Sequence, residues 1–423
     1  MTANARFVRD HVHELRSISP DDGAGDDLEA FSRIAEGEGV RVVAIGEGAH
    51  FMKEYWSIRR RLFRHLHERF GFDVFAMEFG FAEGFVLDRW VRGEGGDDGL
   101  EEYGRAAARW GAGETMRWLR RYNRLQAARG AAVRFAGIDL PEAAGAPSTA
   151  LLPFCEYAVR VEPRLEGSLR EAVAICEKID GPSSLAAAVR WRELPVEEQD
   201  RLFAILHNAR LRFHALEPHY AEAGGPGAHA VALRELDAAV CTLYLLRSIG
   251  EGGVAGGLPL DVSVREHFMA QSVLWLLRAH PQSRVFLLAH NNHVQKTPVA
   301  YGAYVAAIPM GRYLQQSLGG GYRAVAVTST ARHTAEMRLD DASPTGFRVE
   351  DVPLRDARPG SVNAFLEENG LAGRPVLIDL STDAAVDFDS IRSQSAFVDT
   401  SVKAAFDAVV SLPQVTLDDA VRF

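Results

Sequence analysis

Ionisable side chains follow several apolar runs of this sequence, at the points where the runs end. "VVAIGEGAHF" places Glu47 and His50 directly after apolar residues, and "FAMEFG", "AGIDLP" and "AHNNHV" place further ionisable residues in the same way. Carboxylates beside imidazoles are suited to general acid–base catalysis near neutral pH, because a carboxylate orients a histidine and tunes its pKa. The residues that could act in this way are Glu47, His50, Glu78, Asp139, His290 and His293.

The sequence motifs of several other enzyme classes are absent or incomplete. The sequence contains neither the G-x-S-x-G of serine hydrolases nor the G-x-x-x-x-G-K-[ST] of phosphate-binding loops. "GEG" lacks the third glycine of a dinucleotide fingerprint, and "HNNH" is not the HExxH of zinc proteases. Histidines and glutamates also bind divalent metals, so a metal-dependent site is an alternative. We expect acid–base chemistry without a metal or a cofactor.

The apolar runs predict the elements that position these residues. Because helical patterns separate the runs, they indicate an α/β fold with a mostly parallel central sheet flanked by helices. In such sheets, ligands bind outside the carboxyl ends of the strands, so we expect the ionisable residues on one edge. The expected strands are residues 40–45, 72–77, 133–138, 283–289 and 322–329, with 374–380 as a candidate sixth.

A helix is expected over residues 54–71, directly after His50. Its apolar residues recur near helical spacing, and Gly71 is a typical stop. Three consecutive arginines, 59–61, fit a solvated helix face, although one of them could turn toward the sheet edge because the helix starts so close to His50.

The middle of the chain differs from the rest. From about Pro147 to Gly250 the pattern is helical with little strand signal, and the Gly-rich segment 250–261 follows. We interpret this as a helical insertion that could act as a lid, with a glycine-rich hinge at its exit. The expected organisation is an α/β domain in two parts, residues 1–146 and 257–423, around an insertion over residues 147–256.

Composition narrows the class of protein. The chain has 423 residues, 47% of them hydrophobic, and a formal net charge of -10, which argues against a general nucleic-acid or anionic-membrane surface. No apolar run is long enough to span a membrane, and the N-terminus does not resemble a signal peptide. The three cysteines lack a CxxC spacing and fit a reducing compartment, so we expect a cytoplasmic protein whose partner is a small molecule.

An ordered set of motifs resembles the erythromycin esterase family. The motifs are "GEGAHFMKEYWSIRRRL", "FAMEFG", "WLRRYN", "AGIDLP", "REHFMAQSV", "AHNNHV" and "MGRYL", and the resemblance extends from about Val40 to Val327. It implies an α/β domain with a helical part framing the substrate cleft. It also implies hydrolysis of a macrolide lactone, in which a histidine activates water without a serine nucleophile or a cofactor.

The resemblance suggests a role for each matching residue. His50 would be the base, and Glu47 and Glu78 would shape its hydrogen bonding. Arg59 occupies the family's arginine position in the helix, and His290 matches its second histidine. The expected substrate-binding residues are His293, Arg265 of "REHFMAQS" and Asp139, and a cationic arginine would stabilise an oxyanion.

Departures from the family pattern keep the substrate open. Ala49 and Phe51 stand where Thr and Gly are usual beside the histidine, Gln271 and Ser272 stand where Glu and Asn are usual, and Pro141 replaces a common Gln. We therefore expect a hydrolase of a bulky, partly hydrophobic ester or lactone. The alternatives are a biosynthetic enzyme that uses the same site for elimination, dehydration or cyclisation, and a protein that only binds and sequesters a small molecule.

Overall fold

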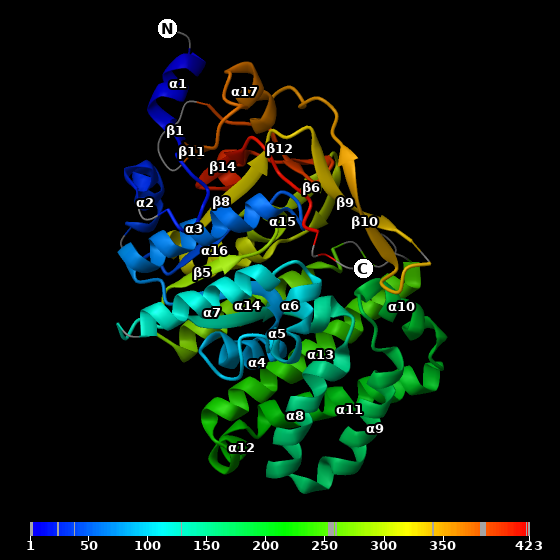
Figure 1. Ribbon diagram of the computed structural model, residues 1–423. Helices are drawn as coiled ribbons and strands as arrows, with labels where there is room; N and C mark the ends of the chain where they lie inside the picture. The colour runs from blue at the N-terminus through cyan, green and yellow to red at the C-terminus, as the bar shows by residue number, and fades with distance from the viewer. Residues whose placement is uncertain are drawn as a thin grey trace.

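A large mixed sheet forms the centre of the molecule (Figure 1). The computed structural model describes residues 3–22, 25–37, 39–127, 129–252, 258, 260–340, 342–380, 386–419 and 421. Within these ranges the sheet has eight strands, which in spatial order are β1 (Val12–Glu14), β11 (Val376–Asp379), β14 (Ala408–Leu412), β8 (Tyr322–Ser329), β2 (Val42–Ile45), β5 (Val285–Leu288), β3 (Val74–Gly80) and β4 (Arg134–Asp139). Neighbours from β14 to β4 pair in parallel, whereas β11 is antiparallel to both β14 and β1. The predicted mostly parallel α/β fold is confirmed.

All six predicted strands are present, with small shifts at their ends. β8 has the predicted bounds, and β2, β4, β5 and β11 differ from prediction by one or two residues at an end. β3 differs more, because it continues to Gly80 and therefore contains Glu78 instead of ending before it. Strand β1 at the edge of the sheet and the interior strand β14 were not predicted.

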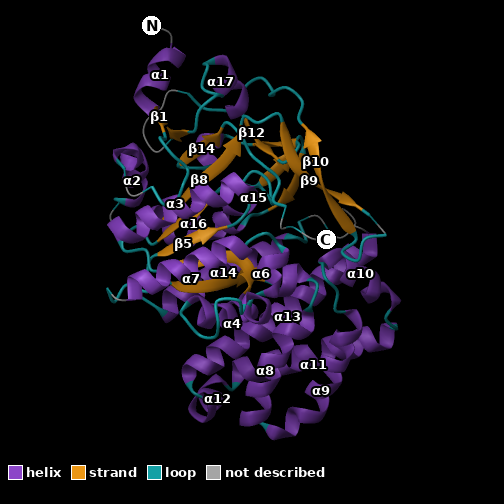
Figure 2. Ribbon diagram, viewed as in Figure 1, coloured by secondary structure: helices purple, strands orange, loops and turns teal. Residues whose placement is uncertain are grey.

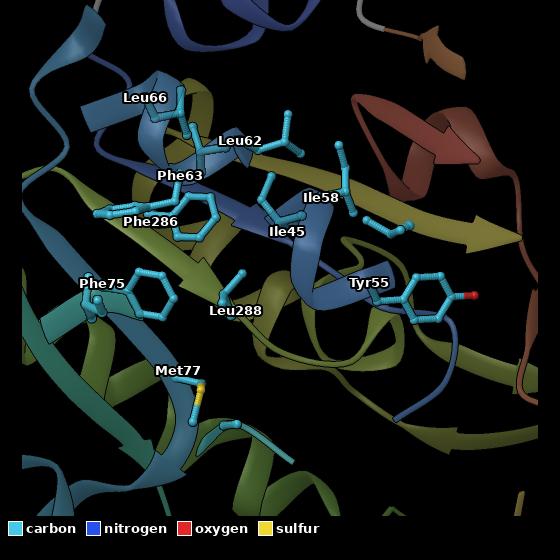
Figure 3. Close-up of a cluster of buried hydrophobic side chains, with 14 of the residues drawn as sticks. Ile45, Tyr55, Ile58, Leu62, Phe63, Leu66, Phe75, Met77, Phe286 and Leu288 are labelled. Atoms are coloured by element: carbon cyan, nitrogen blue, oxygen red, sulfur yellow. The ribbon is translucent and has the colours of Figure 1, made fainter. Parts of the chain in front are cut away.

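The sheet is covered on both faces, which explains the near-continuous apolar runs (Figure 2). Val43 and Ile45 of β2 belong to one apolar core, and Val42 and Ala44 belong to the other. The first core contains α3 (Lys53–Phe70) and α7 (Gly113–Ala127), and Figure 3 shows α3 side chains against Phe75, Phe286 and Leu288. The second core contains α14 (Ser263–Ala279), α16 (Met310–Leu318) and α17 (Val362–Glu368).

Helix α3 confirms one prediction and corrects another. It ends at Phe70, and Gly71 follows with φ of 67°, a left-handed conformation that glycine adopts readily. The expectation of a solvated arginine face was wrong, because all three arginines are buried. Arg60 pairs with Glu114, and Arg61 with Asp27, so the neighbouring segments supply carboxylates that the local pattern did not indicate.

The segment between β4 and β5 begins with a helical array. Its helices are α8 (Pro147–Val161), α9 (Glu166–Ile179), α10 (Ser184–Glu193), α11 (Val196–Ala215), α12 (Glu217–Gly224) and α13 (Pro226–Gly252). They enclose an apolar core of their own, and Figure 1 shows them at the end of the molecule away from the N-terminus. Residues 253–257 and 259 of the expected hinge lie outside the described residues. The three-part division and the role as a lid stay predictions.

The remaining described elements are short helices and the strands of three separate two-stranded sheets. They are the helices α1 (Ala3–His11), α2 (Glu29–Ala35), α4 (Phe81–Val91), α5 (Leu100–Tyr103), α6 (Arg105–Arg109), α15 (Asn291–Val294) and α18 (Val402–Ala405), and the strands β6 (Val299–Tyr301), β7 (Tyr304–Ala307), β9 (His333–Leu339), β10 (Phe347–Pro353), β12 (Ser390–Ser393) and β13 (Ala396–Asp399). No helix in the described part of the chain is long and apolar enough to cross a membrane.

Candidate active site

A cavity of about 250 Å³ lies at the edge of the sheet where β2, β5, β3 and β4 end. Seven of the eight predicted site residues line it: Glu47, His50, Arg59, Glu78, Asp139, Arg265 and His293. His290 is not among the lining residues, but its ring centroid lies 5.1 Å from that of His50. The structure therefore brings the residues predicted from the strand ends together at one edge of the sheet, and their roles stay predictions.

His50 is held by Glu47, which is itself held by Arg59. His50 Nδ1 lies 2.8 Å from Glu47 Oε1, and Arg59 Nη1 donates to Glu47 Oε2 at 2.6 Å. Arg59 also donates to the carbonyl oxygens of Gly46 at 3.1 Å and Ala289 at 2.8 Å. With Nδ1 bonded to the carboxylate, His50 keeps Nε2 for the cavity, and its side chain is 29% exposed.

Arg265 joins the two carboxylates delivered by β3 and β4. Its Nη2 donates to Glu78 Oε1 at 2.8 Å, and its Nε donates to Asp139 Oδ1 at 2.9 Å. Among the described residues no acceptor lies within hydrogen-bond distance of Nη1, and the side chain is 26% exposed. Arg265 thus has a donor available for a ligand, whereas the Arg59 side chain is only 1% exposed.

His293 lies between two carboxylates, one of which the sequence analysis missed. Its Nδ1 is 2.6 Å from Glu266 Oε1, and its Nε2 is 3.2 Å from Glu78 Oε1. Burial disfavours the imidazolium, but the two carboxylates outweigh burial and raise the pKa of His293 to about 10. Glu266 follows Arg265 in "REHFMAQS", and only its position on α14 beside His293 reveals its role.

The surroundings lower the pKa of both Glu78 and His290, which favours a charged carboxylate and a neutral imidazole. Burial opposes ionisation of Glu78, yet His293 and Arg265 hold the pKa of its carboxyl well below the usual range. Burial, and then the nearby His50 and His293, lower the pKa of His290 far below that of a free histidine. His290 accepts a hydrogen bond from the Asn292 amide through Nδ1, and its own amide donates to Glu78 Oε2 at 3.0 Å.

Large apolar side chains from distant segments form the other walls. Met77, Phe51, Trp56, Trp110 and Met337 line the cavity, together with Phe79, the carboxylates Glu83 and Glu142, smaller residues, and Ser184 at the start of α10. Phe51 stacks on Trp110 with ring centroids 6.0 Å apart. Phe51 also has φ of 66°, which is costly for a bulky residue and which its sequence context did not predict.

The polar groups of the cavity favour acid–base chemistry over metal binding. Both His293 nitrogens and one His50 nitrogen are engaged by carboxylates. In the described ranges no group of three or more His, Cys, Asp or Glu side chains is arranged to hold a metal ion. Independence from metal stays a prediction for the active protein.

Comparison with known proteins identifies the family. The erythromycin esterase family model matches residues 67–415. The chain is 30% identical to erythromycin esterase type II of Escherichia coli over 422 residues, which cover 98% of each chain. The chain belongs to the erythromycin esterase family. It is also 31% identical to erythromycin esterase type I of Escherichia coli over 385 residues, covering 91% of this chain and 93% of that one.

A solved structure from the same family has the same fold. It is an erythromycin esterase mutant, EreC, in its open conformation, with a TM-score of 0.89 and 28% sequence identity, and the match covers 97% of this chain and 100% of that one. The resemblance deduced from the motifs is confirmed, and the family identifies the chain as an esterase-like hydrolase.

Proposed function

We propose that this erythromycin esterase family member hydrolyses a macrolide-type lactone or a similarly bulky ester, with His50 as the general base. The single observation that carries the proposal is the hydrogen bond between His50 Nδ1 and the buried Glu47, which leaves Nε2 as a base facing a cavity. A carboxylate that orients a histidine in this way also stabilises the imidazolium formed during proton transfer.

The reaction needs no group beyond the chain and a water molecule. His50 Nε2 takes a proton from water, and the hydroxide attacks the ester carbonyl carbon. Arg265 Nη1 stabilises the oxyanion of the tetrahedral intermediate, since it has no acceptor within hydrogen-bond distance among the described residues and its side chain is partly exposed. The bond from carbon to the alkoxy oxygen then breaks, and the leaving alkoxide takes the proton from His50, which yields an alcohol and a carboxylic acid.

In this mechanism Arg59 and His290 position other groups. Arg59 uses its guanidinium to hold Glu47 and two carbonyl oxygens, so it fixes the orientation of His50. The His290 ring lies 5.1 Å from the His50 ring, and its lowered pKa keeps it neutral beside the base. A neutral neighbour favours the imidazolium of His50 during catalysis more than a second cation would.

The substrate class rests on the relatives and on the walls of the cavity. The two Escherichia coli relatives are erythromycin esterases, and aromatic and methionine side chains supply apolar contact area for a bulky substrate. A protein that only sequesters such a molecule would not need a hydrogen-bonded acid–base pair. An eliminating or cyclising enzyme could use the same base, and the reaction products distinguish the two.

The test compares His50→Gln with a matched control, His207→Gln on the exposed surface of α11. Glutamine keeps hydrogen-bonding capacity but removes the base, so we expect turnover of a macrolide lactone to fall by about 10²–10⁴-fold. The control should match the native enzyme. A His50→Gln rate near the native rate would refute the assignment of the base.

A further inference from the structure

Glu266 is buried beside the cavity and uses both carboxylate oxygens. Oε1 lies 2.6 Å from His293 Nδ1, and Oε2 accepts the backbone N–H of Met310 at 2.9 Å. The residue is 4% exposed and lies near the start of α14, while Met310 begins α16. Glu266 therefore joins the histidine to two helices that cover the sheet.

The pair of carboxylates around His293 determines its protonation state. A neutral imidazole has one N–H, so it can donate to only one of two acceptors, whereas an imidazolium can donate to both. Both ring nitrogens of His293 face carboxylate oxygens, Glu266 on one side and Glu78 on the other. Nδ1 is hydrogen-bonded to Glu266 and Nε2 lies within ion-pair distance of Glu78, so this arrangement favours the charged form. The same two carboxylates raise the pKa of His293 to about 10.

The charges around this imidazolium come from several elements. α14 contributes Glu266 and Arg265, and β3 contributes Glu78, which Arg265 also contacts. Tyr313 of α16 interacts electrostatically with Glu266, and the His290 ring lies 6.3 Å from that of His293. Without the proton on His293, Arg265 alone would face Glu78 and Asp139, with Glu266 uncompensated.

We propose that Glu266 is a positioning residue that keeps His293 a permanent imidazolium. The positive charge of His293 neutralises Glu78, and Arg265 is then free to direct Nη1 at the substrate. This inference rests on the proposed function, because Arg265 matters only if an oxyanion forms. Glu78 Oε1 is shared by Arg265 at 2.8 Å and His293 at 3.2 Å, so the charge of His293 acts directly on the arginine's partner.

The test is the pH dependence of kcat/KM in Glu266→Gln. Glutamine can still accept a hydrogen bond from His293 but removes one negative charge, so the imidazolium loses its proton at lower pH. We expect the alkaline limb of the profile to move down by at least one pH unit, so that kcat/KM at pH 9 falls at least about twofold relative to the native enzyme. Glu266→Asp, which keeps the charge, should restore the native limb, and Glu101→Gln on the exposed face of α5 serves as the control.

A second measurement is independent of turnover. NMR of protein labelled with nitrogen-15 in histidine, assigned with His293→Gln, reports the protonation of the His293 ring directly. We expect this ring to stay protonated to pH 9 in the native protein and to titrate lower in Glu266→Gln. A native His293 that titrates near pH 7, or a Glu266→Gln variant with an unmoved titration, would overturn the inference. If no ester is hydrolysed but the titration behaves as expected, the proposed function fails while the ion pair stands.

Discussion

Replacing Arg59 with methionine should destabilise the fold far more than the same change at the next residue. Arg59 is buried and binds Glu47, Gly46 and Ala289, so Arg59→Met leaves a buried carboxylate without its cation. Breaking a buried ion pair from one side costs about 3–5 kcal/mol. Arg60 pairs with Glu114, whose side chain is 76% exposed, so Arg60→Met should cost about 1 kcal/mol or less.

The assay is urea unfolding of both variants, followed by fluorescence and far-UV circular dichroism in parallel. Methionine keeps an apolar stem of similar length, so packing changes little in either variant. Equal destabilisation of the two variants would refute the reasoning, because the buried Arg59–Glu47 pair would then contribute no more to the free energy of unfolding than the Arg60–Glu114 pair. If Arg59→Met does not fold, Arg59→Lys, which keeps the charge but loses the bidentate fork, should be lower than both native and Arg60→Met in activity and in stability.

Three further predictions concern pH, backbone strain and metal. Burial, and then Arg69 and Arg61, lower the pKa of His65 to about 4. As the pH falls, His65 is protonated near pH 6.5 in the unfolded state but only near pH 4 in the folded state, so the free energy of unfolding should decrease by about 2 kcal/mol at pH 5. His65→Gln should remove this decrease in urea melts compared at pH 7 and pH 5. Because Phe51 has φ of 66°, Phe51→Gly should be more stable than Phe51→Ala by about 1 kcal/mol in thermal melts, and the reverse order would contradict the backbone conformation. Chelator-treated enzyme should keep its activity, and a stoichiometric metal lost together with activity would make the histidines ligands.

The ionisable residues at this edge of the sheet could be predicted because the patterns that indicate them are local in the sequence. Each buried strand is a short apolar run, and the residue types that follow it are visible in the sequence, so Glu47, His50 and Asp139 needed only the rule that parallel strands end on one edge. Glu78 was assigned to the correct place although β3 runs past it, since the chain direction is the same.

The partners of these residues depend on contacts between distant segments. Glu266 meets His293 because α14 packs beside the β5–α15 turn, and no periodicity within α14 indicates that contact. Arg60 and Arg61 can be buried because Glu114 and Asp27, which belong to other segments, form ion pairs with them. Trp110 and Met337 reach the cavity from segments outside the motifs. Short local patterns identify the reactive groups, whereas tertiary packing determines which of them are paired.

The central claim is that water activated by His50 attacks an ester carbonyl, and reaction in oxygen-18 water tests it most directly. The native enzyme acting on a macrolide lactone should give a ring-opened acid with one labelled carboxylate oxygen, detected by mass spectrometry, and His50→Gln should give almost none. Turnover whose product contains no label from water would contradict hydrolysis and would favour elimination or cyclisation at the same site.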